Sequence, residues 1–253
     1  MRVNCSIVLY HTPFSEVQKA ITVLRASGVV GKIWLVDNTE RRYANDMTIN
    51  SSTDTVEGCE YIFGHENIGF GRGHNIALEK SLETDADYHI VMNSDLIFEP
   101  KVICQLVEFM DAHPDIAHVM PRVLNLDGTD QHLAKRLPTP WDLIQRRLFH
   151  SHNCELELPD KGIYDVPYLS GCFMFLRMTA LRELKERDGY VFDPRYFLYP
   201  EDIDLTRRLH EMYRTVCYSD VTIKHHHART SYKSLKLSCI HAWNMIKYFW
   251  KWR

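Results

Sequence analysis

Strand-like runs of aliphatic and β-branched residues alternate with amphipathic helical patterns through the first half of the chain. This alternation limits the possible folds more than any other feature, because successive strands joined by helices need crossover connections and form a parallel sheet with helices on its faces. The expected strands are 4–10, 33–36, 60–63 and 88–92, and the expected helices are 15–26 and 73–82.

Regular patterning continues with an expected helix at 101–113 and a strand at 116–119. The stretch 124–165 has weak periodicity and is interpreted as an insertion or as an excursion on the substrate side of the fold. Beyond it we expect a strand at 168–176, a helix from Thr179, another after Pro200, a strand at 215–218 and a final helix over 233–252. The chain is therefore predicted to be α/β, with a mixed, mostly parallel sheet.

Composition narrows the classes of partner. A net charge of -3 offers no global basic field for a phosphate backbone, which argues against nucleic acid as a partner. The seven cysteines lack C-x-x-C spacing, which argues for a reducing compartment and against a zinc knuckle. No run has the length of a signal or membrane-spanning segment, so we expect a cytoplasmic protein.

Acidic residues follow two of the expected strands. Asp37 ends the second strand and Asp95 follows the strand at 88–92, so both belong at the carboxyl edge of the sheet, where α/β proteins bind ligands. Asp95 is a candidate ligand for Mg²⁺ or Mn²⁺, which prefer carboxylate oxygen. The alternative is that Asn93, Ser94 and Asp95 form only an Asx-type turn.

An aromatic segment, 192–199, leads into three acids at an expected helix start: Glu201, Asp202 and Asp204. One of these carboxylates could deprotonate an acceptor hydroxyl. Acids in a first turn after Pro200 are also what helix capping and the macrodipole favour. Three acids are more than helix capping requires, and their negative charges repel one another. A bound cation or a shared proton would relieve this repulsion, which favours a functional site.

Three histidines, 225–227, follow a strand-like run. In an extended chain His225 and His227 point to one side and His226 to the other. A solvated loop is the plain alternative. Arg229, as a possible diphosphate partner, favours a functional interpretation.

The loop Asn67-Ile68-Gly69-Phe70-Gly71-Arg72-Gly73-His74-Asn75 is rich in glycine and enters a helix. Its spacing is not G-x-G-x-x-G and it follows the third strand, so it fails the dinucleotide fingerprint. We expect its glycines to let the backbone approach a phosphate-bearing ligand, with the helix N-terminus near the phosphates.

Together these segments resemble the inverting family-two glycosyltransferases of the GT-A fold, and among them the bacterial rhamnosyltransferase-like members. The similarity covers nearly the whole chain. Its specific parts are residues 6–13, 36–38, 66–75, 92–95, 169–174 and 197–204. It implies a GT-A domain at 1–232, with a nucleotide-sugar-binding half at 1–123 and an acceptor half at 124–232, and a C-terminal helix at 233–253.

The resemblance also implies residue roles. Asp202 would be the general base, with Glu201 beside it, and Asp95 and His225 would hold the metal. Asn93 stands where the family usually has the first acid of its metal motif, and His74 replaces a commoner Asn. The implied donor-binding residues are Tyr10, His11, Thr12, Asp37, Asn67, Gly69, Arg72, Asn75, Asn93, Ser94 and Arg229.

By the same resemblance, the chain would transfer L-rhamnose from dTDP-β-L-rhamnose, with inversion, to a glycan or lipid-linked glycan in capsule or O-antigen synthesis. The alternatives are another donor such as a UDP-sugar, a sugar nucleotidyltransferase, or a sugar-binding protein without activity. The position 10–13 lacks the lysine or arginine that a nucleotidyltransferase needs for a triphosphate.

The C-terminal helix combines aromatic residues with cations. Helical spacing of Ile240, Trp243, Ile246 and Trp250 predicts a stripe packed on the domain. Residues 250–253 would then be free to touch lipid at the inner face of the cell membrane, a peripheral contact that suits a lipid-linked acceptor.

Overall fold

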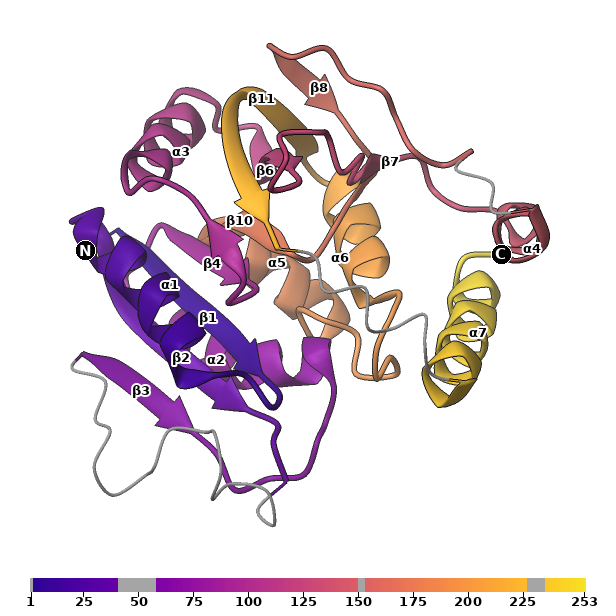
Figure 1. Ribbon diagram of the computed structural model, residues 1–253, viewed down its shortest axis with the longest axis horizontal. Helices are drawn as coiled ribbons and strands as arrows, with labels where there is room; N and C mark the ends of the chain where they lie inside the picture. The colour runs from indigo at the N-terminus through magenta and orange to yellow at the C-terminus, as the bar shows by residue number, and fades with distance from the viewer. Residues whose placement is uncertain (1, 41–57, 150–152, 227–234) are drawn as a thin grey trace.

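The computed structural model describes residues 2–40, 58–149, 153–226 and 235–253 (Figure 1). Within them one sheet has nine strands in the order β3-β2-β1-β4-β10-β6-β11-β5, with β8 paired to β11. These strands are β1 (Val3–Leu9), β2 (Val30–Asp37), β3 (Cys59–Ile62), β4 (Tyr88–Met92), β5 (Leu96–Ile97), β6 (Ile116–Leu124), β8 (Ile163–Asp165), β10 (Phe173–Arg177) and β11 (Arg214–His225). Strands β7 (Ala134–Lys135) and β9 (Tyr168–Leu169) form a small second sheet.

Seven helices lie in the same part of the chain: α1 (Phe14–Ala26), α2 (Phe70–Leu82), α3 (Lys101–Ala112), α4 (Pro140–Phe149), α5 (Met178–Asp188), α6 (Glu201–His210) and α7 (Leu235–Lys251). The α/β prediction is confirmed. The sheet is parallel from β3 to β4 and again between β6 and β11. Strand β10 runs antiparallel between β4 and β6. The sheet is therefore mixed, with its change of direction in the middle.

The two faces of the sheet carry separate cores because successive side chains of a strand point to opposite sides. On β10, Phe173 and Phe175 belong to one hydrophobic cluster with residues of α1 and α3. Met174 and Leu176 belong to another with residues of α2, α5 and α6. The sheet is thus buried on both sides, and its ligand-accessible part is the edge where the strands end.

The structure corrects three expectations in the second half. The stretch 124–165 holds α4 and the short strands β7 and β8 rather than only irregular chain. The strand expected at 168–176 is divided into β9 and β10. The strand expected at 215–218 and the strand-like run before the histidines are one strand, β11, which reaches His225. Short or interrupted elements carry too few residues for periodicity to identify them.

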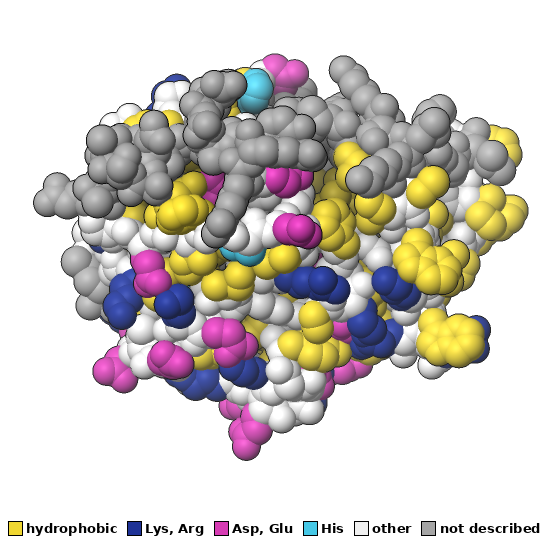
Figure 2. Space-filling model, turned by 90° about the horizontal axis from the view of Figure 1, so that it is seen from below, with side chains coloured by type: hydrophobic (Ala, Val, Ile, Leu, Met, Phe, Trp, Pro, Cys, Tyr) yellow, Lys and Arg dark blue, Asp and Glu magenta, His cyan; other side chains and the backbone are white. Residues whose placement is uncertain are grey.

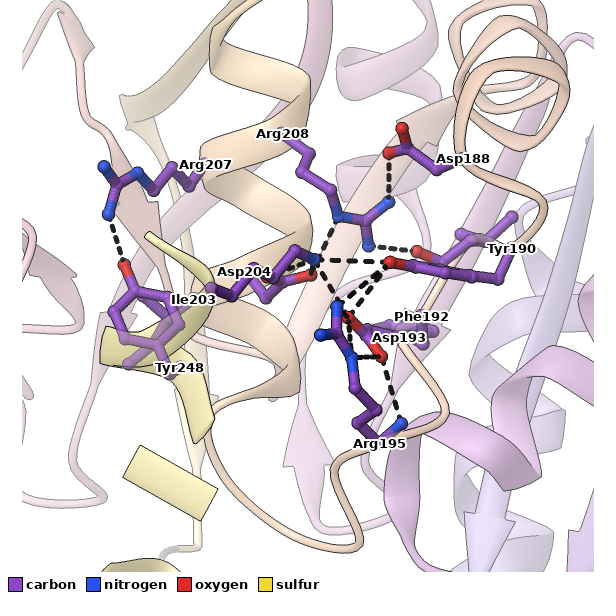
Figure 3. A network of polar contacts seen from close by, with 12 residues as sticks. Asp188, Tyr190, Phe192, Asp193, Arg195, Ile203, Asp204, Arg207, Arg208 and Tyr248 are labelled. Carbon is purple, nitrogen blue, oxygen red and sulfur yellow. Dashed lines mark hydrogen bonds and ion pairs between the residues drawn. The ribbon is translucent and has the colours of Figure 1, made fainter. Parts of the chain in front are cut away.

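Helix α7 is attached to α6 by a buried ionic network (Figure 3). Asp204 of α6 accepts hydrogen bonds from Arg208 at 2.8 Å and from the indole of Trp252 at 2.9 Å, and Lys251 lies 2.7 Å away. Lys251 also pairs with Asp193 at 2.9 Å. The expectation that Lys251 and Trp252 are free to touch lipid is therefore wrong, because these two side chains anchor the helix.

Arg208 provides a test of this network. Its guanidinium is 2% exposed and bridges Asp204 and Asp188. We expect Arg208→Gln to lower the free energy of unfolding by about 3–5 kcal/mol, because it leaves buried acids short of a partner. The matched control is Arg214, which bridges Asp165 and Asp115 but is 41% exposed. Arg214→Gln should lower the free energy of unfolding by about 0–1 kcal/mol. Urea titration of both variants measures the difference. Equal losses for both variants would contradict the structural role of the network.

Candidate active site

Three parallel strands of the sheet end at one edge, which carries the residues predicted to bind the nucleotide. Asn38, just after β2, donates its backbone N–H to the carbonyl of Leu9 at the end of β1. Asp37 is buried, and its carboxylate accepts hydrogen bonds from the backbone N–H of Thr39 at 2.8 Å and from the hydroxyl of Tyr61 at 2.5 Å. The side chain is thus held in one orientation at the base of the edge.

Residues 10–12 form the turn after β1. The N–H of His11 donates to the hydroxyl of Thr39 at 2.9 Å, and the N–H of Tyr10 donates to the hydroxyl of Thr12 at 3.2 Å. His11 has a positive φ of 51°, a backbone state that costs energy in a residue other than glycine. The ring of Tyr10 is half exposed beside this turn. The turn therefore presents an aromatic ring at the edge of the sheet where β1 and β2 end.

The glycine-rich loop packs closely on the aromatic segment that precedes α6. Asn67 accepts a hydrogen bond from the N–H of Gly69 at 3.0 Å, and Asn38 donates to the carbonyl of Gly69 at 3.0 Å. Gly69 has a φ of 90°, and a Cβ there would lie 1.9 Å from the carbonyl oxygen of Phe197. Only glycine fits this contact, which joins the two predicted halves of the site.

Three further residues of this glycine-rich segment lie in the first turns of α2 and have structural partners. Asn75 donates to the carbonyl of Phe192 and accepts from its N–H, so both of its amide groups bind the backbone. Arg72 donates to the carbonyl of Pro194 at 2.7 Å. His74 is fully buried and contacts the hydroxyl of Ser6 through Nδ1 at 2.8 Å. These side chains attach α2 to the segment at 192–194 and to β1.

Asp95 and His225 are brought together at the same edge. Nε2 of His225 lies 3.1 Å from Oδ1 of Asp95 and 3.5 Å from the amide nitrogen of Asn93. Ser94 points elsewhere, since its hydroxyl donates to the carboxylate of Glu16. The loop at 93–95 therefore turns, as the alternative interpretation requires, and also directs Asp95 towards an imidazole.

Gln131 determines which nitrogen of His225 carries a proton. Its amide nitrogen donates to the carbonyl of His225 at 2.9 Å, so its oxygen, 3.1 Å from Nδ1, must accept. Nδ1 is therefore the donor. Nε2 then faces Asp95 either as the second N–H of an imidazolium or as a lone pair that can share a cation with the carboxylate.

No group of three or more His, Cys, Asp or Glu side chains within the described ranges is arranged to hold a metal ion. The pair formed by Asp95 and His225 still fits a divalent cation, because Mg²⁺ and Mn²⁺ keep several waters and take remaining ligands from substrate phosphates. The orientation that Gln131 imposes on His225 is the arrangement expected of a metal-binding histidine.

Asp202 lies at the first turn of α6 and is partly exposed. Its Oδ2 accepts a hydrogen bond from the N–H of Gly171 at 3.0 Å, and its Oδ1 accepts one from the N–H of Ile203 at 2.8 Å. Burial raises the pKa of Asp202, while these N–H groups and the charge of Lys135 oppose the rise. The carboxylate is held in place and made more basic than a free aspartate, which suits a proton acceptor.

The segment 171–172 connects the two acidic positions. The carbonyl of Cys172 accepts a hydrogen bond from the N–H of Asn93 at 2.9 Å, while the neighbouring Gly171 binds Asp202. Burial raises the pKa of the Cys172 thiol to about 12, with the charges of Asp95 and Asp202 adding to the rise. Both carboxylates are thus close enough to affect one thiol, and the candidate base and metal ligand share one site.

Glu201 differs from its neighbour. It is buried, and one of its carboxyl oxygens has no hydrogen-bond partner in the described part of the chain. Burial, followed by repulsion from Asp202, raises the pKa of Glu201 to about 8. At neutral pH the group is mainly protonated, so it is suited to positioning and not to accepting a proton.

Arg229 and His227 lie outside the described residues, and His226 is exposed. Three contributors were not found from the sequence: Gln131, Gly171 and Glu16. Gln131 lies in the stretch interpreted as an insertion and 94 positions from His225. Gly171 lies in the segment 169–174, and its residue type alone indicates no partner. No spacing in the sequence relates these residues to the acids they contact.

Solved structures share this architecture. A structure of GalNAc-T7 with UDP, GalNAc and Mn²⁺ matches 89% of this chain and 43% of that chain, with a TM-score of 0.64 and 12% identity. Residues 1–349 of Staphylococcus aureus TarS in complex with UDP-GlcNAc match 90% of this chain and 59% of that chain, with a TM-score of 0.54 and 14% identity. The fold is the GT-A fold of nucleotide-sugar transferases.

The sequence assigns the family. The family model described as Glycosyl transferase family 2 matches residues 7–185, and this chain belongs to that family and is a glycosyltransferase. Rhamnosyltransferase WbbL of Escherichia coli is 24% identical over 211 residues, which are 80% of this chain and 75% of that protein. The N-acetylglucosaminyl-diphospho-decaprenol L-rhamnosyltransferase of Mycobacterium tuberculosis is 25% identical over 191 residues, 65% of this chain and 58% of that protein.

The raised pKa of Glu201 predicts how stability depends on pH. The folded state keeps a proton that the unfolded state releases above its ordinary value of 4.5, so the free energy of unfolding falls as pH rises from 4.5 to about 8. Glu201→Gln has no proton to release, so it should gain stability relative to the wild type as pH rises through this window. Urea unfolding across the window measures this, with Glu108→Gln on the exposed side of α3 as the control. If the free energy of unfolding depends on pH in the same way for the wild type and for Glu201→Gln, then Glu201 is not buried as a protonated carboxyl.

Proposed function

We propose that this chain transfers L-rhamnose from dTDP-β-L-rhamnose to a hydroxyl of a glycan or lipid-linked glycan, with inversion of the anomeric carbon. Family membership and two relatives named as rhamnosyltransferases support the class of reaction and the sugar. The name of one relative specifies a diphospho-decaprenol-linked substrate, which supports a lipid-linked acceptor. The single structural observation that carries the proposal is the fixed carboxylate of Asp202, which residues 171–172 link to the loop whose Asp95 pairs with His225.

In this mechanism Asp202 accepts the proton of the acceptor hydroxyl as that oxygen attacks the anomeric carbon. The bond between that carbon and the diphosphate breaks in the same displacement. The N–H groups of Gly171 and Ile203 keep the carboxylate oriented through the reaction. Because one carboxylate acts as base and no covalent intermediate with the protein is needed, configuration is inverted.

The departing diphosphate needs compensation for its growing charge. Asp95 and His225 would bind Mg²⁺ or Mn²⁺, which when bound stabilises negative charge on the leaving group. Gln131 holds the imidazole in the matching tautomer. At the nucleoside end, Asp37 would accept the N–H of the pyrimidine imide, and Tyr10 would lie against the base. Arg229 would be a further diphosphate contact.

The donor is the main alternative within this proposal. Two structures with the same fold contain UDP or UDP-GlcNAc, so a UDP-sugar donor has independent support. A sugar nucleotidyltransferase would need a cation at 10–13, and those residues are Tyr10, His11, Thr12 and Pro13. An inactive sugar-binding protein would release no nucleoside diphosphate from any donor.

Asp202→Asn tests the base. We expect the rate of transfer to fall about 10²–10⁴-fold, because the amide cannot accept a proton, while dTDP affinity stays within about threefold. The measurement is dTDP release from dTDP-β-L-rhamnose with acceptor, repeated with UDP-GlcNAc as the alternative donor. Glu201→Gln is the matched control, because it also replaces a carboxylate by an amide, one residue away. Its rate of transfer should fall less than about tenfold. If Asp202→Asn keeps more than about a tenth of the rate, Asp202 is not the base.

Asp95→Ala tests the cation site. We expect dTDP binding to weaken much more with Mn²⁺ present than in EDTA, because only the metal-assisted part of the affinity depends on this carboxylate. Calorimetric titration under both conditions measures the difference. Ser94→Ala is the control, since its hydroxyl binds Glu16 and not the site. Equal weakening in Mn²⁺ and EDTA would mean that Asp95 only shapes the turn.

A further inference from the structure

Helix α7 has a second face that the domain does not cover. Asn244, Met245 and Tyr248 are buried against the domain. On the other side Trp243, Ile246 and Trp250 are 60%, 56% and 68% exposed. Their spacing of three and four residues places them in one stripe along the helix. The packed stripe expected from the sequence, which included Trp243, Ile246 and Trp250, therefore faces outward.

Helix α4 also exposes large hydrophobic side chains. Its Leu143 packs against the cluster that contains Met245 and Tyr248 of α7, and Figure 1 shows the two helices side by side. On its other side α4 exposes Trp141, Ile144 and Phe149. We call these six side chains the α4/α7 surface. They are six of the twelve large hydrophobic side chains that the described residues expose, so half of this exposure comes from two helices that contribute to one hydrophobic cluster.

Positive charge accompanies the α4/α7 surface. The ammonium of Lys247 lies 5.9 Å from the ring centre of Trp243, and the guanidinium of Arg253 lies 3.9 Å from that of Trp250. Residues 235–253 contain four Lys and Arg and no Asp or Glu, and one of the four, Lys251, is bound to Asp193 and Asp204. Figure 2 shows hydrophobic side chains gathered on the side where α7 lies, with Lys and Arg next to them.

We propose that the α4/α7 surface binds an anionic lipid bilayer. Exposed tryptophans with interspersed cations match the apolar boundary and negative headgroups of such a membrane. A second copy of the chain is a poorer match, since a two-fold interface would place the same cations against each other. No helix in the described part of the chain is long and apolar enough to cross a membrane, so the contact would be along the membrane surface.

The same helix holds the loop that leads to the candidate base. Asn244 donates a hydrogen bond to the carbonyl of Leu198 at 2.9 Å, and the rings of Tyr199 and His241 are 5.2 Å apart. Leu198 and Tyr199 directly precede Pro200 and α6. Docking through α7 would therefore place the acceptor side of the site near the bilayer. Only this last step rests on the proposed transfer to a lipid-linked acceptor.

The test is co-sedimentation of the full chain with vesicles of phosphatidylcholine, with and without phosphatidylglycerol. We expect binding to the anionic vesicles that weakens as salt rises. Trp243→Ser, Ile246→Ser and Trp250→Ser together should reduce it about tenfold or more, with an unchanged melting temperature, because these side chains are exposed. The matched control replaces Phe63, Leu126 and Ile163, which are also exposed but lie elsewhere, and should bind as wild type does.

Three outcomes would overturn the proposal: no binding of the intact chain to anionic vesicles at low salt, equal binding by the triple variant, or a dimer in light scattering that the triple variant converts to a monomer. Transfer to a water-soluble acceptor is measured in parallel. The triple variant should retain it, so a failure of the membrane contact and a failure of the proposed reaction give different results.

Discussion

The arrangement of the site depends on the pair of backbone hydrogen bonds made by residues 171–172. At this point the sheet changes from its parallel half to the antiparallel strand β10. The carbonyl oxygen of Cys172 accepts a hydrogen bond from the N–H of Asn93, at the end of β4. The N–H of Gly171 donates a hydrogen bond to the carboxylate of Asp202. A Cβ on Gly171 would lie 3.2 Å from that of Asp202, so a small residue is needed there. Two acids that are distant in sequence are positioned by one short backbone segment.

The two neighbouring acids of α6 show how environment separates similar groups. Asp202 has N–H donors on both oxygens and some exposure, which maintain its charged form. Glu201 is buried with an unpartnered oxygen and is held protonated. Asp204, in the same first turn of α6, is paired with Arg208 and Lys251 and so holds α7 in place. Three acids that look equivalent in sequence therefore have three different environments.

Much of the first half could be predicted because its elements are long and periodic. The expected strand at 88–92 coincides with β4, and the helices expected at 15–26 and 101–113 differ from α1 and α3 by a residue at one end. Placement of Asp37 and Asp95 at one edge followed from topology alone. In the second half α4 was missed because a ten-residue helix gives only a weak period. Strand β11 was divided because its pairing with β6 shifts register between Tyr218 and Thr222. The roles of the site residues remain proposals.

By itself the sequence determined the α/β class, the family and the edge of the sheet that carries polar residues, since these follow from local periodicity and motif order. Only the tertiary structure decided which side of α7 is buried. Helical spacing is the same for Trp243 and Ile246 as for Met245 and Tyr248, and the choice between them comes from Asp204, which binds Trp252 and Lys251. The pairing of His225 with Asp95 and Gln131 is likewise tertiary. Long-range contacts of this kind leave no periodic signal in a single sequence, because the energy that selects them appears only when distant segments meet.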